Sequence, residues 1–195
     1  MRDRSDLKRL LVLAGLTISC LLASALPALA QTGGTGTPGG TTTDTTAAPT
    51  GPPGRATLLS DGTAVAPANA PPAVQAAIAA GNAIHTLPYK WGGGHNPTFQ
   101  DTGYDCSGSV SYVLHGAGLL SSPMPSGPLA RAWGLPGKGQ WITVYANASH
   151  AYMVVAGLRF DTSAVGERLN SGSGPRWRAS KRKAAGYTAK HPDGL

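Results

Sequence analysis

One cysteine and one histidine have the types and the spacing needed for nucleophilic catalysis. Cys106 stands in the run Asp-Cys-Ser-Gly at 105–108, directly before an amphipathic helical pattern, and His150 follows 44 residues later at the start of a strand-like run. The N-terminus of a helix stabilises a thiolate through its free N–H groups and its dipole. A neutral imidazole can accept the thiol proton and later protonate a leaving amine. We therefore predict that Cys106 is a nucleophile and His150 its base, with backbone N–H groups near Cys106 binding the oxyanion.

Asp161 is the predicted partner of this histidine. It follows His150 by 11 residues, and Gly157 lies between them as an expected turn. His150 would begin one strand of an antiparallel hairpin and Asp161 would end the next, which places them side by side. A carboxylate there would fix the tautomer of the imidazole. The alternative is a turn residue that caps Thr162 or Ser163.

Other polar residues near the cysteine have simpler interpretations. Asp105 is predicted to cap the helix, because a carboxylate directed at the thiol would raise the thiol pKa. His95 either lines a cleft beside Cys106 or lies on a surface loop. The histidines show no zinc-ligand spacing with the cysteine, so we predict no metal and no cofactor.

The first 30 residues have the pattern of a secretory signal peptide. Four basic residues precede an apolar run from Leu10, and Ala28 to Ala30 is a small-x-small cleavage site. We expect export, with a single transmembrane anchor as the alternative. Removal of the signal peptide would take Cys20 with it and leave Cys106 unpaired. An unpaired thiol outside the cell favours a nucleophile over a chance cysteine.

Residues 31–68 have the composition of a disordered linker. The stretch 31–53 is almost wholly Gly, Thr, Pro and Ala, which cannot bury enough apolar surface to offset the entropy of the chain. Within 57–65 an Asp-Gly turn separates apolar residues, so this segment is either a small docked hairpin or part of the linker. Residues 69–195 are then expected to form one small domain.

The fold class predicted for this domain is α+β, with helices first and an antiparallel sheet after them. Apolar spacing predicts one helix over 72–84 and a second from Cys106 to Gly116 or Gly118. The stretch 121–138 is rich in Pro, Gly and Ser and is predicted to be an irregular loop. Strands are expected over 141–145, 150–155 and 158–162, and another within 176–188.

The chain carries a formal net charge of +7, and residues 1–30 hold four basic and two acidic groups, which leaves +5 on the remainder. The positive charge gathers near the end of the chain. Its simplest interpretation is a solvated basic face, and the functional one is attraction to anionic wall polymers outside the cell. Nucleic acid is not expected as a partner, since no aromatic-interleaved pattern accompanies the charge. The basic residues of this segment are Arg176, Arg178, Lys181, Arg182, Lys183 and Lys190.

Three elements, in order along the chain, resemble the NlpC family of cell-wall cysteine peptidases. They are Tyr-Lys-Trp-Gly-Gly at 89–93, Asp-Cys-Ser-Gly at 105–108, and His150 before an apolar strand. The resemblance covers about residues 72–165 and implies a papain-like fold in which Cys106 is the nucleophile and His150 the base. It also implies that Tyr89 assists substrate or oxyanion binding. The third polar residue of the family is usually His, Asn or Gln, and Asp161 stands at the matching place.

This resemblance implies a peptidase that cuts peptidoglycan stem peptides through an acyl-enzyme, at a bond between D-glutamate and a diamino acid. With the predicted signal peptide, we expect a secreted enzyme, and we expect it to be a monomer. The chain departs from the family pattern over 121–139 and after Gly166, which leaves the bond cleaved open. The same dyad could serve a peptidoglycan amidase or an acyltransferase. A non-catalytic wall-binding module is the remaining alternative. Trp133, in the predicted loop, is expected to contact the substrate.

Overall fold

The computed structural model of the protein describes residues 54–167 and 173–195. The expected signal peptide and the stretch 31–53 of the expected linker lie outside the described residues. Among the described residues, no helix is both long enough and apolar enough to cross a membrane. The elements are β1 (Thr57–Leu58), β2 (Ala64–Val65), α1 (Pro72–Ile84), α2 (Cys106–Gly116), α3 (Ser126–Arg131), β3 (Leu135–Pro136), β4 (Ile142–Ala146), β5 (Ala151–Val155), β6 (Leu158–Asp161), β7 (Arg176–Arg178) and β8 (Thr188–His191).

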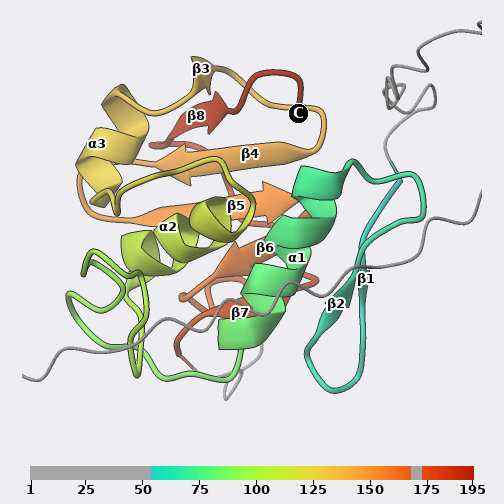
Figure 1. The fold of residues 1–195 in the computed structure, drawn as a ribbon, viewed down its shortest axis with the longest axis horizontal. Helices are drawn as coiled ribbons and strands as arrows, with labels where there is room; N and C mark the ends of the chain where they lie inside the picture. Colours follow the sequence, from blue (N-terminus) through green and yellow to red (C-terminus); the bar gives the residue numbers. More distant parts are fainter. Residues whose placement is uncertain (1–53, 168–172) are drawn as a thin grey trace, which may run out of the picture. The chain divides into compact units, whose positions relative to one another are not determined.

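The fold is α+β, as predicted, with helices packed on an antiparallel sheet. The strand order is β3-β8-β4-β5-β6-β7, and every neighbouring pair is antiparallel. Helices α1 and α2 lie side by side over one face of this sheet, and α3 packs near the β4 and β8 edge (Figure 1). The hairpin β1–β2 is a separate small sheet that contacts α1.

The alternation of side chains along the strands explains this layering. In β4, Ile142 and Val144 point into the apolar core beneath the helices, and the intervening Thr143 and Tyr145 belong to the opposite face. The same alternation puts Tyr152 on that opposite face, where its ring stacks on Tyr145 with centroids 4.9 Å apart. The two faces therefore differ in character. One is apolar and covered by helices, and the other carries polar and aromatic side chains.

Glycine permits two close approaches that hold the helices in place. A Cβ atom at Gly81 in α1 would lie 2.4 Å from the Trp177 ring, so the bare backbone lets the helix settle on β7. A Cβ atom at Gly108 in α2 would lie 1.9 Å from the carbonyl oxygen of Gly93. The first turn of α2 is thereby packed against the glycine-rich loop that precedes it.

The helices predicted from apolar spacing are confirmed, since α1 covers Pro72–Ile84 and α2 begins at Cys106. The strands β4, β5 and β6 are confirmed to within a residue at their ends, and Gly157 forms the expected turn with φ of 74°. Within 57–65 the hairpin alternative holds, with Thr57 paired to Val65. The expected linker therefore does not extend through this segment.

Two expectations for the irregular regions are wrong. The stretch 121–138 contains the helix α3 and the strand β3, and α3 packs on the domain through the buried side chains of Leu129 and Ala130. The sequence did not predict this helix because two apolar residues are too few to show a helical period. The single strand expected within 176–188 is two separated strands. β7 pairs with β6, whereas β8 crosses to pair with β4 and β3, and no local sequence signal encodes this crossing.

Candidate active site

Cys106 is the first residue of α2 and is 8 % exposed. Among the described residues it is a free cysteine. Burial by itself raises the pKa of the Cys106 thiol, but hydrogen bonding from His150 and from the backbone of Ala151 outweighs it. The thiol pKa is therefore held below its ordinary value, which favours the reactive thiolate.

A tight turn between β4 and β5 positions His150. The backbone N–H of Asn147 donates to the carbonyl oxygen of His150 at 3.0 Å, and the side-chain oxygen of Asn147 accepts from the backbone N–H of His150 at 3.0 Å. This turn joins β4 to β5 where Ala146 pairs with Ala151. His150 thus lies immediately before β5, at the end of the strand that is nearest to Cys106.

The imidazole of His150 is held between two acidic groups. Its Nε2 lies 2.9 Å from Oδ1 of Asp161, and because a carboxylate only accepts, Nε2 carries the proton of this bond. The other ring nitrogen, Nδ1, is left for the thiol of Cys106. Burial lowers the pKa of His150, but the hydrogen bonds and charges of Asp161 and Cys106 prevail and raise it to about 9. The pair accordingly favours a thiolate beside an imidazolium.

Asp161 ends β6 and is 1 % exposed. Its Oδ1 accepts from the backbone N–H of Ser163 at 2.9 Å as well as from His150, so the predicted partnership and the turn cap coexist. Its Oδ2 accepts from Nη1 of Arg182 at 3.0 Å. Burial raises the pKa of Asp161, but the bonds from His150 and Ser163 and the charge of Arg182 hold it below its ordinary value. Asp161 therefore stays ionised beside the imidazole.

Asp105 organises the loop beside the cysteine. Its Oδ1 accepts from the backbone N–H of Gly108 at 2.7 Å, which is the predicted helix cap. The same carboxylate bonds the backbone N–H of Gly92 at 3.1 Å and the Nε2 of His95 at 3.0 Å. Its negative charge acts to raise the pKa of Cys106. Asp105 thus stabilises the structure around the thiol at some cost to thiolate formation.

An open groove of about 770 Å³ runs along this site. His95 lines it, so the cleft interpretation of this residue holds. Trp91 is 87 % exposed at the groove, whereas Trp133, expected to contact the substrate, is 7 % exposed and donates its Nε1–H to the carbonyl oxygen of Leu119. That expectation is wrong because the segment around Trp133 folds onto the core. Other groove-lining residues are Asp105, Cys106, Ser107, Ser126 and Ser149.

Tyr89 lies near the thiol but outside the lining of the groove. It is 40 % exposed, and its backbone forms an isolated bridge with Tyr104. Burial, together with the charges of Cys106 and Asp105, raises the pKa of its phenol. The hydroxyl group therefore remains a hydrogen-bond donor close to Cys106.

The basic residues near the end of the chain do not all lie on a solvated face, because some are buried and paired while others are exposed. Arg178 is 2 % exposed and pairs with Glu167, and the Arg176 guanidinium donates to the carbonyl oxygens of His85 and Leu87. Arg182 reaches Asp161 from this segment, a role that sequence analysis missed because no local pattern marks it. Lys181 and Lys183 remain exposed.

Comparison with known proteins finds a distantly similar solved structure and no matching family model. No protein-family model matches the chain, and no curated protein matches it. Among solved structures the chain is similar to a hypothetical invasion protein of Mycobacterium tuberculosis, Rv1477, with 23 % identity and a TM-score of 0.41. That similarity covers 61 % of this chain and 63 % of the other, so this chain spans less than two thirds of its length. Within the described residues, no group of three or more His, Cys, Asp or Glu side chains is placed to hold a metal ion.

Proposed function

We propose that the protein is a secreted cysteine peptidase of papain-like fold that hydrolyses an amide bond in peptidoglycan stem peptides. The observation that carries this proposal is the connected set Cys106, His150 and Asp161 at the N-terminus of α2. The thiol has a lowered pKa, the imidazole has a raised one, and a buried carboxylate orients the imidazole. These are the properties of an activated nucleophile with a positioned base.

The chemistry follows from these positions. Sγ of the Cys106 thiolate would attack the carbonyl carbon of the scissile amide, and the oxygen would gain the negative charge. Backbone N–H groups at the start of α2, with the hydroxyl of Tyr89 nearby, are suited to stabilise that oxyanion. The imidazolium of His150 would give its proton to the leaving amine, which leaves a thioester. Water, deprotonated by the neutral imidazole, would then attack the thioester and release the acid and the thiolate.

Peptidoglycan as substrate is supported by the sequence resemblance described above and by the character of the groove. The groove is open enough for an extended peptide, and Trp91 offers an exposed ring at its border. Asp105, Ser107 and His95, which are hydrogen-bonded to one another, add polar side chains to the lining of the groove. By the same resemblance, the bond joins the side chain of D-glutamate to a diamino acid.

The experiment that tests this proposal is digestion of purified muropeptides, analysed by mass spectrometry. We expect internal cuts in the stem peptide, and a loss of turnover of at least about a thousandfold in Cys106→Ala. His150→Ala should fall comparably, and His191→Ala, on β8 and outside the groove, should retain parent activity.

Other outcomes would redirect the proposal. Release of the intact stem peptide would indicate an amidase with the same dyad, and transfer to an added amine would indicate an acyltransferase. Near-normal turnover in either Cys106→Ala or His150→Ala would refute the mechanism. Wall binding that weakens with salt, without cleavage, would favour a binding module.

A further inference from the structure

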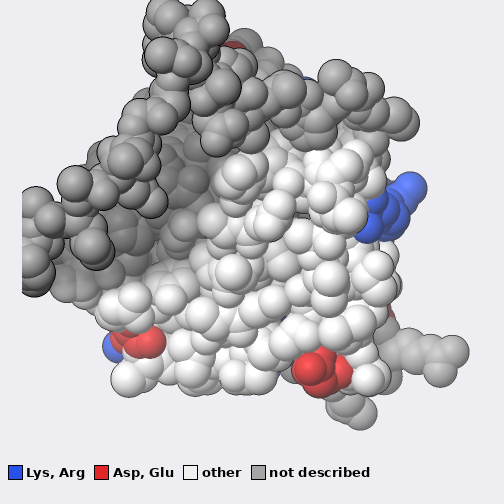
Figure 2. Space-filling view, turned by 45° about the vertical axis from the view of Figure 1, so that its right-hand side comes forward, with Lys and Arg blue, Asp and Glu red and all other residues white. Residues whose placement is uncertain are grey.

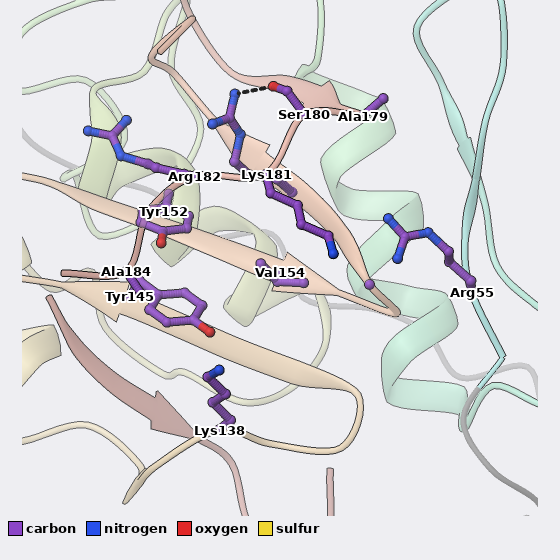
Figure 3. Close-up of a pocket in the computed structure, with 12 residues that line it drawn as sticks. Arg55, Lys138, Tyr145, Tyr152, Val154, Ala179, Ser180, Lys181, Arg182 and Ala184 are labelled. Atoms are coloured by element: carbon purple, nitrogen blue, oxygen red, sulfur yellow. Dashed lines mark hydrogen bonds between the residues drawn. The ribbon is translucent and has the colours of Figure 1, made fainter. Parts of the chain in front are cut away.

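A second cavity lies on the face of the sheet turned away from α1 and α2. Tyr145, Tyr152 and Arg159 line it, and these residues alternate along their strands with members of the apolar core. The segment after β7 forms another wall with Lys181 and Arg182 (Figure 3). The cavity measures about 320 Å³, roughly the space of ten water molecules. This size is at the lower end of the range for small-molecule sites.

This cavity, called here the basic pocket, is lined by five cationic residues: Arg55, Lys138, Arg159, Lys181 and Arg182. No Asp or Glu of the described residues lines it. By contrast, few charged side chains are seen on the face of the molecule in Figure 2. These five cations thus come from four separate segments of the chain to surround one hollow.

Carboxylates neutralise only part of this charge. Arg182 pairs with Asp161 at 3.0 Å, and Arg159 pairs with Glu167 at 3.2 Å. Within the described residues, Arg55, Lys138 and Lys181 have no carboxylate at ion-pair distance. Three positive charges around the basic pocket therefore lack a counter-charge from the described part of the chain.

The buried floor of the basic pocket also has an unsatisfied donor. The Arg159 side chain is 2 % exposed, and its Nε–H has no hydrogen-bond partner among the described residues. Its nearest carboxylate oxygen, Oδ2 of Asp161, is 3.8 Å from Nε. Because this Nε atom is itself buried, the Arg159 guanidinium contributes positive charge to the basic pocket rather than a free N–H group. Arg55 lies against the Gly157 turn at the rim, where a Cβ atom would be 3.0 Å from its Nη1.

We propose that the basic pocket binds phosphate groups. Phosphate oxygens are strong acceptors that match both the guanidinium fork and the ammonium groups present here. The hydroxyl of Tyr145 lies on the same side as the Lys138 ammonium and adds a neutral donor (Figure 3). The pocket has room for one phosphate or for a short run of them, so the ligand is either a free phosphate compound or a polymer with repeated phosphate groups.

This site is distinct from the groove that holds Cys106, since the two cavities share no lining residue. The proposal therefore stands independently of the peptidase function. Cys106→Ala should bind phosphate as the parent does, whatever its effect on hydrolysis.

Isothermal titration of the full 195-residue chain with inorganic phosphate and with long-chain polyphosphate, at low ionic strength, tests the proposal. Lys181→Ala and Lys138→Ala should each weaken binding about fivefold, as expected for exposed charge contacts. Lys183→Ala is the matched control, because it removes the same charge from the same exposed segment but does not line the basic pocket. It should change the affinity less than twofold.

Titration with the two probes distinguishes a free phosphate compound from a polymer as the ligand. Saturable binding of inorganic phosphate with the expected variant pattern identifies a free phosphate compound, and the same pattern with polyphosphate alone identifies a polymer. Equal losses in all three lysine variants would reduce the effect to general charge attraction and overturn the proposal. Absence of binding to both probes would overturn it as well.

Discussion

The groove beside Cys106 and the basic pocket share no lining residue and differ in chemistry, yet one buried carboxylate, Asp161, bonds a residue next to each. The groove contains one thiol, a histidine and the carboxylate of Asp105, and it is built by the loop before α2 and the turn before β5. The basic pocket contains only cationic and neutral side chains, and it is built by the outer face of the sheet and the segment after β7. Asp161 bonds His150 on the groove side through Oδ1 and Arg182 on the pocket side through Oδ2.

This difference shows how the buried carboxylate of Asp161 is kept ionised beside the imidazole of His150. Burial alone would favour the protonated acid, but hydrogen bonds from His150 and Ser163, with the positive charges of His150 and Arg182, lower the pKa of Asp161. The groove thereby gains an orienting carboxylate without an arginine competing for the thiolate. The basic pocket supplies that arginine from a segment remote in sequence.

Among changes that bear on both regions, replacement of Asp161 should have the largest effect, because this residue bonds a side chain next to each. Asp161→Ala leaves Nε2–H of His150 and the guanidinium of Arg182 without their partner, and we expect muropeptide turnover to fall at least about a hundredfold. Removing the carboxylate from its buried ion pair with Arg182 should also lower the free energy of unfolding by about 3–5 kcal/mol. Turnover per folded molecule and urea unfolding, measured together, separate the two losses.

Asp161→Asn is the matched variant, since its oxygen can still accept from Nε2 of His150. We expect it to lose less turnover than Asp161→Ala. Equal turnover of both variants and the parent would show that the contact has no catalytic role.

The pH dependence of Cys106 alkylation sharpens the description of the groove. The thiol pKa is lowered, so alkylation by iodoacetamide should stay fast below the pH at which a free thiol becomes unreactive. His150→Ala removes the hydrogen bond and positive charge that lower it, and burial then raises the thiol pKa, so the profile should move to higher pH. Free-thiol behaviour in the parent protein would contradict the proposed thiolate–imidazolium pair.

The imidazole itself gives a second pH readout. We expect His150 to titrate near pH 9 in the parent, and NMR of its ring protons measures this midpoint. The carboxylate of Asp161 is one cause of that raised pKa, so Asp161→Asn should move the midpoint to lower pH. An unchanged midpoint would mean that Asp161 does not act on the ring.

Arg182 tests whether the two cavities can be perturbed separately. Its guanidinium pairs with Asp161, bonds the hydroxyl of Tyr187 at 2.8 Å and lies 5.4 Å from the ring centroids of Tyr152 and Tyr187. Arg182→Ala should reduce both phosphate affinity and muropeptide turnover, each by about tenfold. Lys181→Ala, one residue away, should reduce phosphate affinity alone. Loss of turnover in Lys181→Ala would contradict the separation.

The smallest expected effect concerns Asp105. Asp105→Asn keeps an N-cap acceptor for Gly108 while it removes a charge that raises the thiol pKa. Its amide nitrogen cannot accept from the backbone N–H of Gly92, so stability should fall by about 1 kcal/mol although Asn and Asp are similar caps. The alkylation profile should move slightly to lower pH. Asp105→Ala, which removes the cap and the other bonds, should cost about 2–3 kcal/mol in urea unfolding.

Local patterns predicted much of the scaffold. The spacing of apolar residues gave α1 and α2 because one helix face must be buried, and alternation gave β4 to β6. The pairing of His150 with Asp161 could be predicted because both belong to one hairpin with a glycine turn. The helix α3 could not, since only two of its six residues are both apolar and buried, which is too few to show a hydrophobic period in the sequence.

By itself, the sequence determined which residue types stand at the start of α2 and of β5, and therefore which chemistry is available. Only the tertiary structure decided that Arg182 meets Asp161, that Trp133 is buried while Trp91 is exposed, and that cations from four segments surround one pocket. The physical reason is the distance along the chain between the residues that come into contact. Helix and strand periods are set by neighbours a few residues apart, whereas these contacts join residues whose separation is closed only when β7 and β8 take their places on either side of β4–β6.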